Sequence, residues 1–311
     1  MVKGNQTRVW NFILMGFSDL PVQQQVILFI TFLTVYLVTV MGNLLTIVLV
    51  TVDRRLHTPM YFFLRSLSFL DICYINVTVP NMLKGLLSTQ NTILFLGCAV
   101  QMYFFICLAT IDCFLLAVMA YDRYVAICYP LRYPTIMNKS RCTQLVVYCW
   151  SGGFLLSMGQ TTFIFSLQYC GSNVIAHFFC DIPPVIILAS TDTFFNQVAI
   201  FIYTIFVILG PFLLILSSYV RILSTVLKMQ SVSGMKKAFS TCTSHLFSVS
   251  LLYASGTVMY LRPTSSHSQN TDRLLALFYV LLMPMFNPII YSLRNKEMKE
   301  AFWKLILTRM L

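Results

Sequence analysis

Thr193–Val220 reads TFFNQVAIFIYTIFVILGPFLLILSSYV, a run of 28 residues without a single Lys, Arg, Asp or Glu. A helix that crosses the hydrocarbon core of a bilayer needs roughly 20 mostly apolar residues. The run is therefore long enough to span a membrane. Further charge-free stretches of comparable length are Leu20–Val52, Gly85–Ile111, Cys142–Cys180, Ala238–Leu261 and Leu274–Leu293.

The composition of the whole chain supports the same conclusion. Of its 311 residues, 58% are hydrophobic and only 10% are charged, whereas a typical globular domain has about 25% charged residues. A soluble fold of this length has too little interior to bury so many apolar side chains. The composition thus excludes an ordinary soluble protein and indicates a membrane protein.

We predict an all-α membrane protein with seven spanning helices. Thr58–Leu83 adds a span that is interrupted only by Arg65 and Asp71. Cys142–Cys180 is too long for one span, and the turn-forming residues that follow Tyr169 indicate that it ends in an ordered loop. The expected spans are 26–52, 58–83, 95–127, 142–164, 196–227, 237–261 and 272–292.

The basic residues predict the orientation of these spans. With the N-terminus outside, the inner segments carry fifteen Lys and Arg residues and the outer segments carry five. Since cytoplasmic loops are enriched in Lys and Arg, we expect the C-terminus in the cytosol. The chain then divides into an extracellular segment 1–25, a seven-helix transmembrane domain 26–292 and a cytosolic segment 293–311. Asn5 begins a glycosylation sequon on the outer side.

The segment after the seventh span predicts an amphipathic helix rather than an eighth span. Lysines occupy one of its faces. The opposite face carries Leu293, Met298, Ala301, Phe302, Leu305 and Ile306. Such a helix lies in the membrane interface.

Three of the ten cysteines fall on the expected outer side, namely Cys98, Cys170 and Cys180. Because this compartment is oxidising, we expect one disulfide and one free thiol. A bridge from Cys98 to either of the other two would hold the long second outer loop against the bundle. The count alone does not choose the pair.

Met119–Cys128 reads MAYDRYVAIC and resembles the corresponding motif of odorant receptors, a branch of the rhodopsin-like (class A) G-protein-coupled receptors. The resemblance extends in order through nearly the whole chain, and two of its motifs are particular to odorant receptors. The further motifs are Gly42-Asn43, LHTPMYFFL at Leu56–Leu64, LSFLD at Leu67–Asp71, Pro211, KAFSTC at Lys237–Cys242 and NPIIYSLRN at Asn287–Asn295.

The resemblance implies that the disulfide joins Cys98 to Cys180. Odorant receptors commonly have a second bridge within the long loop, from the position of Cys170. Ser190 stands where its partner cysteine is usual, so we expect Cys170 to be free and the loop to be less constrained than in relatives.

Two acids lie deep within the expected spans, Asp71 and Asp112. A carboxylate at membrane depth costs roughly 2.5–3.5 kcal/mol, so it usually faces the interior and has a partner. In related receptors such a cluster binds a sodium ion in the inactive state, and the resemblance implies this role for Asp71, Asp112 and Asn287. The alternative is a protonated polar core without an ion.

Asp122 and Arg123 lie at the expected cytosolic mouth of the third span. By resemblance, Asp122 holds Arg123 in the inactive state, and Arg123 swings out when the sixth span moves. The alternative is an ordinary interfacial pair whose long side chain reaches toward water. The other residues expected in this activation switch are Tyr124, Tyr219, Asn287, Pro288 and Tyr291.

The resemblance places the ligand site in the half of the bundle near the expected outer face, between spans three, five, six and seven. Phe105 stands where amine receptors have an acid, which argues against a cationic ligand. We expect one hydrogen bond from Tyr260 or Thr257; the alternative for each aromatic residue is plain core packing. The expected lining residues are Phe105, Ile106, Ala109, Thr110, Tyr203, Val207, Tyr253, Gly256, Thr257, Tyr260 and Val280.

Other classes of membrane protein fit less well. An enzyme would need an intramembrane nucleophile with a base or a metal motif, and neither is found in the sequence. A transporter would show internal repeats, and none is found in the sequence. A light receptor would need a lysine in Leu274–Leu293, which contains none.

We therefore expect an odorant receptor that binds a small, neutral, mostly apolar volatile. It would activate a heterotrimeric G protein of the stimulatory, olfactory class and raise cAMP. Membrane lipids are expected partners and nucleic acid is not; no cofactor or metal is expected beyond sodium as a modulator. The expected location is the plasma membrane, in olfactory neuron cilia. The alternative is a non-olfactory seven-span receptor for a small lipid or metabolite.

Overall fold

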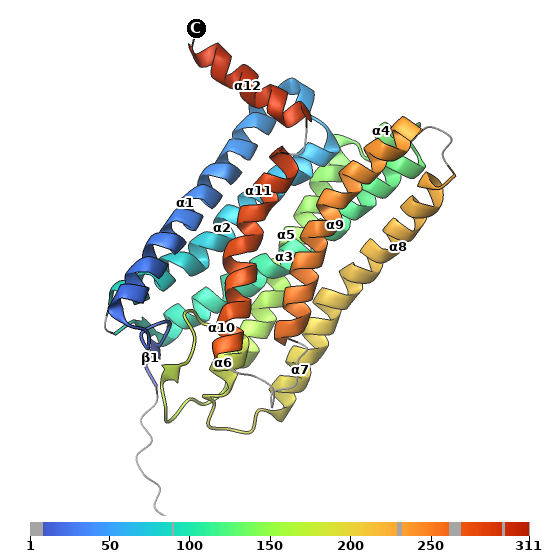
Figure 1. Cartoon of the computed structure of the whole chain (residues 1–311). Helices are drawn as coiled ribbons and strands as arrows, with labels where there is room; N and C mark the ends of the chain where they lie inside the picture. Colours follow the sequence, from blue (N-terminus) through green and yellow to red (C-terminus); the bar gives the residue numbers. More distant parts are fainter. Residues whose placement is uncertain (1–8, 89, 229–231, 261–268, 294–295, 311) are drawn as a thin grey trace, which may run out of the picture.

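Long helices run side by side through the computed structural model, which describes residues 9–88, 90–228, 232–260, 269–293 and 296–310 (Figure 1). Together they form the expected bundle of seven membrane helices. The first four are α1 (Val22–Val52), α2 (Pro59–Leu87), α3 (Phe95–Cys128) and α5 (Lys139–Phe165). The fifth membrane helix consists of α7 (Phe194–Thr204), the π-helical η2 (Ile205–Leu209) and α8 (Gly210–Val226). The sixth is α9 (Val232–Tyr260). The seventh consists of α10 (Gln269–Leu277), the π-helical η4 (Phe278–Leu282) and α11 (Met283–Leu293).

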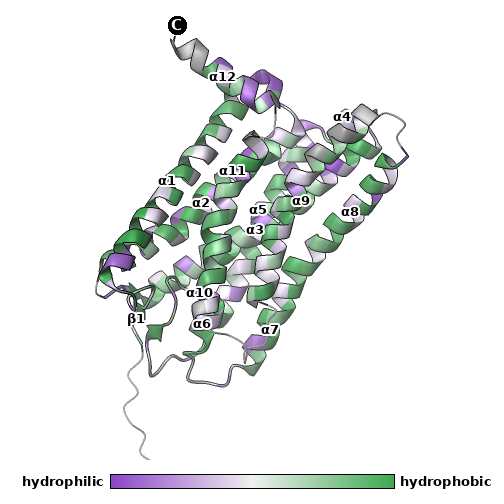
Figure 2. Ribbon diagram, viewed as in Figure 1, coloured by the Kyte–Doolittle hydropathy of each residue, from purple (hydrophilic) through white to green (hydrophobic). Residues whose placement is uncertain are grey.

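Five of these helices are long and apolar enough to cross a membrane by composition: α1, α2, α3, the fifth, and Thr271–Tyr291 of the seventh. The sequences of α5 and α9 are richer in Ser, Thr and Gly, which lowers their hydropathy. Both nevertheless lie within the same bundle (Figure 1). Hydrophobic residues cover most of the length of the helices, and hydrophilic residues gather toward their ends (Figure 2).

The two ends of the bundle carry different short elements. One end, called here the disulfide end, has β1 (Asn11–Leu14), β2 (Thr92–Leu94), β3 (Val174–Ile175) and α6 (Ile182–Ile186). The opposite end, called the α12 end, has η1 (Arg54–Leu56), α4 (Tyr133–Ile136) and α12 (Lys296–Met310). Each end has its own buried apolar cluster.

A small sheet, which the sequence analysis did not predict, covers part of the disulfide end. Its order is β2-β1-β3, with β1 antiparallel to β2 and parallel to β3. Phe12 of β1 is fully buried and stacks on Phe95 at the start of α3. The sheet therefore connects the N-terminal segment to the second long loop and to the bundle.

The amphipathic helix is present as α12. Met298 and Ala301 are buried, whereas Lys299 and Lys304 are exposed. Tyr61 of α2 donates a hydrogen bond to Glu297 at 2.7 Å, which ties the start of α12 to the bundle.

The two π-helical turns each precede a proline. Pro211 lacks the N–H that would bond to the carbonyl of Val207, and Pro284 lacks the N–H that would bond to the carbonyl of Val280. Where this bond is missing, one turn of the helix can contain an extra residue, which makes it a π-bulge. Such bulges are frequent at functional sites. Both turns contribute residues to the cavity described next.

Candidate ligand cavity and activation switch

An apolar cavity lies between α3, the fifth helix, α9 and η4, below the disulfide end. It encloses about 80 Å³. Nine of the eleven expected ligand residues line it: Phe105, Ile106, Ala109, Thr110, Tyr203, Val207, Tyr253, Gly256 and Tyr260.

The structure places the two other expected ligand residues outside this lining. Thr257 is exposed on the outside of α9, because it is one residue and hence about 100° around the helix from Gly256. Val280 is fully buried in the core. Its neighbour Tyr279, in the π-helical turn, lines the cavity instead.

The lining includes eight residues that the sequence analysis did not select. They are Tyr74, Cys113, Ile182, Thr204, Ile208, Leu252, Ser255 and Tyr279. Tyr279 and Ile208 lie in the two π-helical turns, whose registers a regular helical period does not give. Ile182 comes from the loop, and only the disulfide could have indicated that it lies over the cavity.

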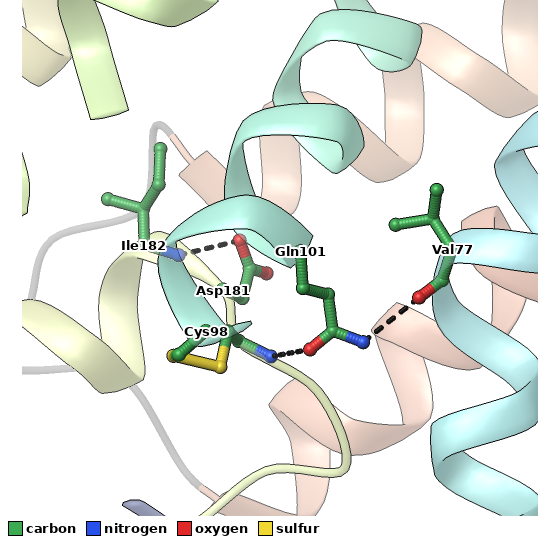
Figure 3. Close-up of a disulfide and its surroundings, with 6 residues drawn as sticks. Val77, Cys98, Gln101, Asp181 and Ile182 are labelled. Carbon is green, nitrogen blue, oxygen red and sulfur yellow. Dashed lines mark hydrogen bonds between the residues drawn. A yellow bond between two sulfur atoms is a disulfide. The ribbon is translucent and has the colours of Figure 1, made fainter. Parts of the chain in front are cut away.

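The Cys98–Cys180 disulfide is present, as the resemblance implied, and it holds the second long loop on α3. Gln101, one turn along α3, reinforces this attachment (Figure 3). Its side-chain oxygen accepts a hydrogen bond from the Cys180 N–H at 3.1 Å, and its amide donates to the Val77 carbonyl of α2 at 2.9 Å. The loop is thereby fixed to two helices at once.

Asp181 follows the disulfide and is fully buried above the cavity. Its carboxylate accepts hydrogen bonds from the Ile182 N–H at 2.7 Å, from Tyr260 at 2.9 and 3.1 Å, and from Tyr279 at 3.0 Å. Burial raises the pKa of Asp181 to about 6, although these hydrogen bonds oppose the rise. The hydrogen bonds favour the ionised form, and through them two lining tyrosines donate to the carboxylate.

Ser190 lies beside Cys170, as expected if it replaces a disulfide partner. Its hydroxyl donates to the Cys170 carbonyl at 2.7 Å and accepts from the Cys170 N–H at 2.9 Å. Cys170 is free, as expected. The loop is nevertheless closed at this point by hydrogen bonds.

The deep polar residues form one buried cluster. Asn287 donates to both carboxylate oxygens of Asp71, at 3.1 and 3.0 Å, and accepts from Ser248 at 3.1 Å. Among the described residues, Asp112 Oδ1 and Asn43 Oδ1 are buried and have no hydrogen-bond partner. Oxygen atoms left in this way fit the coordination that a small hard cation prefers.

Asp122 and Arg123 are both buried at the α12 end of α3. The expected ion pair between them is not among those formed by the described residues; instead Tyr133 of α4 donates to Asp122 at 2.8 Å. Tyr124 turns toward the loop and packs edge-on against Tyr129. The sequence analysis had not selected Tyr133, because α4 has only four residues and no periodic pattern.

Tyr219 of α8 joins a bridge between three helices. The Leu116 carbonyl can only accept, so the Nε2 of His245 carries the proton that bonds to it, at 3.0 Å. His245 Nδ1 then accepts from the Tyr219 hydroxyl at 2.9 Å. The fully buried His245 thus links α9 to both α3 and α8.

The remaining switch residues lie in α11. Pro288 interrupts that helix, and Gly42 of α1 approaches it so closely that an added Cβ would lie 3.2 Å from the ring. Tyr291 is buried in the core of the α12 end. Asn5 lies outside the described residues, and within them no group of three or more His, Cys, Asp or Glu side chains could hold a metal.

Comparison with known proteins identifies similar sequences over almost the full length. The family model described as "Olfactory receptor" matches residues 32–309. Human olfactory receptor 10A5 is 52% identical over 301 residues, covering 97% of this chain and 95% of the relative. Human olfactory receptor 2D2 is 53% identical over 300 residues, covering 96% of each chain.

Proposed function

The chain belongs to the olfactory receptor family, and from this membership we propose a specific ligand site, switch and signalling output for it. As a member it is a multi-pass membrane protein that responds to odorants through a G protein, and it is not an enzyme. The finer statements below are supported by the geometry of the cavity and of the two polar clusters.

We propose that a small, neutral, mostly apolar volatile binds in the cavity under the disulfide-held loop. The observation that carries this proposal is that nine residues expected from the family pattern meet around one enclosed space. The space of about 80 Å³ is below the roughly 300–1,000 Å³ of drug-sized pockets. Binding therefore requires that the wall move outward, and α9 is the helix that presents Tyr253, Gly256 and Tyr260 to the ligand.

Ligand binding would bias a two-state repacking of the α12 end. The His245 bridge holds α9 against α3 and α8 in the state described here. An outward movement of α9 would break this bridge and uncover Arg123 and Tyr219 for the G protein. The ligand favours that state only to the extent that it binds the widened cavity more tightly.

We propose that Asp71 and Asp112 also hold a sodium ion in the inactive state. Asp112 Oδ1 supplies an unsatisfied carboxylate oxygen, while Asn287 orients Asp71. A bound cation would stabilise the ionised form of these two buried carboxyl groups. Basal signalling that falls with added sodium in the parent chain, but not in Asp112→Asn, would support this role; equal sodium dependence of the two would contradict it.

The partner we propose is a G protein of the stimulatory class that raises cAMP. The orientation we propose places the disulfide end and the N-terminus outside the cell and α12 in the cytosol. The plasma membrane of olfactory cilia is the proposed location, and lipids contact the exposed apolar side chains of α1, α7 and α8.

A cAMP-reporter screen of the surface-expressed chain against a broad panel of volatiles tests the ligand site. We expect at least one agonist whose potency falls about tenfold in Tyr203→Phe, which removes the hydroxyl bonded to Thr110. The control is Phe201→Leu, an exposed position of the same helix. An agonist unaffected by Tyr203→Phe and Tyr260→Phe would place the ligand elsewhere.

A further inference from the structure

The hydroxyl groups around the cavity have a common orientation that bears on which ligands can bind. Eight lining residues carry a hydroxyl: Tyr74, Thr110, Tyr203, Thr204, Tyr253, Ser255, Tyr260 and Tyr279. A hydroxyl has a single proton to donate, but its oxygen can also accept. Its use toward a ligand therefore depends on whether the proton is already bonded within the protein.

On α3 and α7 the protons are already used. Thr110 donates to the Ile106 carbonyl at 2.8 Å. Its 2.7 Å contact with the Tyr203 hydroxyl must then be donated by Tyr203. Both groups can only accept a further hydrogen bond.

On α9 and η4 the same is true. Tyr253 donates to the Cys113 carbonyl at 3.3 Å, and Ser255 donates to the Leu251 carbonyl at 2.7 Å. Tyr260 and Tyr279 both donate to Asp181. Six of the eight lining hydroxyls can thus only accept a hydrogen bond from a ligand. The other two are those of Tyr74 and Thr204, for which no side-chain hydrogen bond is seen among the described residues.

The Asp181 carboxylate strengthens this preference. No Lys or Arg of the described chain forms an ion pair with it; Arg273, on α10, pairs with Asp19 instead. Negative charge therefore lies behind the Tyr260 and Tyr279 hydroxyls and raises electron density on their oxygens. In a chain of hydrogen bonds each bond polarises the next, so a hydroxyl that donates to a carboxylate is a stronger acceptor for a further donor.

We infer that the ligand of this cavity is a neutral hydrogen-bond donor, an alcohol or a phenol, that donates to the Tyr260 or Tyr279 oxygen. This deepens the proposed function and rests on it. The oxygen of a ketone, ester or ether with the same carbon skeleton is itself an acceptor. It would face the tyrosine oxygen without forming a hydrogen bond to it. A carboxylate would also be repelled by Asp181. A protonated amine would donate, but it would lose hydration in an apolar cavity that Asp181 itself does not line.

The experiment compares agonists that share one carbon skeleton in the full-length chain, by cAMP reporter with surface staining. Each set contains the alcohol, its methyl ether, the corresponding ketone or aldehyde, and the carboxylic acid. We expect the alcohol to be about tenfold or more potent than the ether and the carbonyl compound, and the carboxylate to be inactive at neutral pH. This comparison uses the unaltered chain, so it does not depend on the folding of a variant.

Two variants locate the donor site. Tyr260→Phe and Tyr279→Phe each remove one accepting oxygen, and at least one of them should reduce the alcohol-to-ether potency ratio toward one. Tyr148→Phe, at an exposed position of α5 outside the cavity, should leave that ratio unchanged. A carbonyl agonist as potent as its alcohol, whose potency depends on Tyr74 or Thr204, would overturn the inference but leave the proposed receptor function intact. No response to any volatile, with surface expression shown, would overturn both.

Discussion

The hydrogen bond from Tyr133 to Asp122 gives the end of α3 a partner that the motif around Arg123 does not reveal. Asp122 is buried and accepts from Tyr133 at 2.8 Å. The short helix α4 thereby holds the carboxylate on one side of α3. Because this contact must contribute to the free energy of the resting state, its loss should favour the active state.

We predict that Tyr133→Phe raises basal cAMP roughly two- to tenfold, the population shift that corresponds to one net hydrogen bond of about 0.5–1.5 kcal/mol. Reporter assays normalised to surface expression measure the change. Tyr148→Phe, at an exposed position of α5, is the control. Basal signalling equal to that of the control would show that Tyr133 does not restrain the switch.

At the residue level, the common position of several side chains could be predicted from the sequence where one helical period relates them. Phe105, Ile106, Ala109 and Thr110 lie along one face of α3 and all line the cavity. Thr257 lies outside that lining, and the bonding of the hydroxyl protons was not predicted. Which hydroxyl is already bonded depends on neighbours distant in sequence, such as Asp181 for Tyr260, and no local pattern contains that information.

At the scale of helices, α5 lies against α3 through a glycine. A Cβ at Gly153 would overlap the Ile111 side chain and lie 3.1 Å from the Cys107 carbonyl. On the same helix, Gly159 has no heavy atom within 4 Å of such a Cβ. Gly153 and Gly159 therefore provide a matched test of how closely α3 and α5 must pack.

Gly153→Val should destabilise the bundle by about 1–3 kcal/mol, the usual cost of overpacking, and reduce surface expression strongly. Gly159→Val should leave expression near that of the parent chain. Surface staining and thermal aggregation of the detergent-solubilised protein measure both. Equal behaviour of the two variants would mean that α3 and α5 can separate without loss.

The second loop offers a separate test at this scale. Ser190 is hydrogen-bonded to both backbone groups of Cys170, so the two residues are already adjacent. We predict that Ser190→Cys forms a disulfide with Cys170 and adds up to about 3 kcal/mol of stability, as expected for a loop of this length. Non-reducing peptide mapping detects the bridge, with Ser190→Ala as the control; a free thiol at both positions would contradict the prediction.

The helix boundaries were predictable to within a few residues because they follow the limits of the charge-free runs. The fifth span, expected at 196–227, is found at Phe194–Val226. The sheet at the disulfide end was not predictable, since β1, β2 and β3 have four, three and two residues. Strands this short form only because the bundle and the disulfide bring their segments together.

For the molecule as a whole, the charge distribution predicts its orientation. By sequence, fifteen basic residues fall in the segments expected inside the cell and five in those expected outside. We predict that Asn5 carries a glycan and that Asn138, at the α12 end, does not, although both begin a sequon. Asn5→Gln should remove an endoglycosidase-sensitive mass shift that Asn138→Gln leaves in place. The opposite result would invert the proposed topology.

The π-helical turns η2 and η4 make the ligand cavity sensitive to chain length as well as to residue type. A π-turn accommodates one more residue than an α-turn, and one residue corresponds to about 100° of helical rotation. Deleting a single residue from Ile205–Leu209 would let the wide turn close to a regular α-turn, which offsets that rotation. Tyr203 and Tyr219 would keep their helix faces, whereas the part of the cavity wall formed by Val207 and Ile208 would change. A one-codon insertion or deletion at these two turns is therefore a route by which the odorant range of such a receptor can change while the half of the molecule that faces the G protein is preserved.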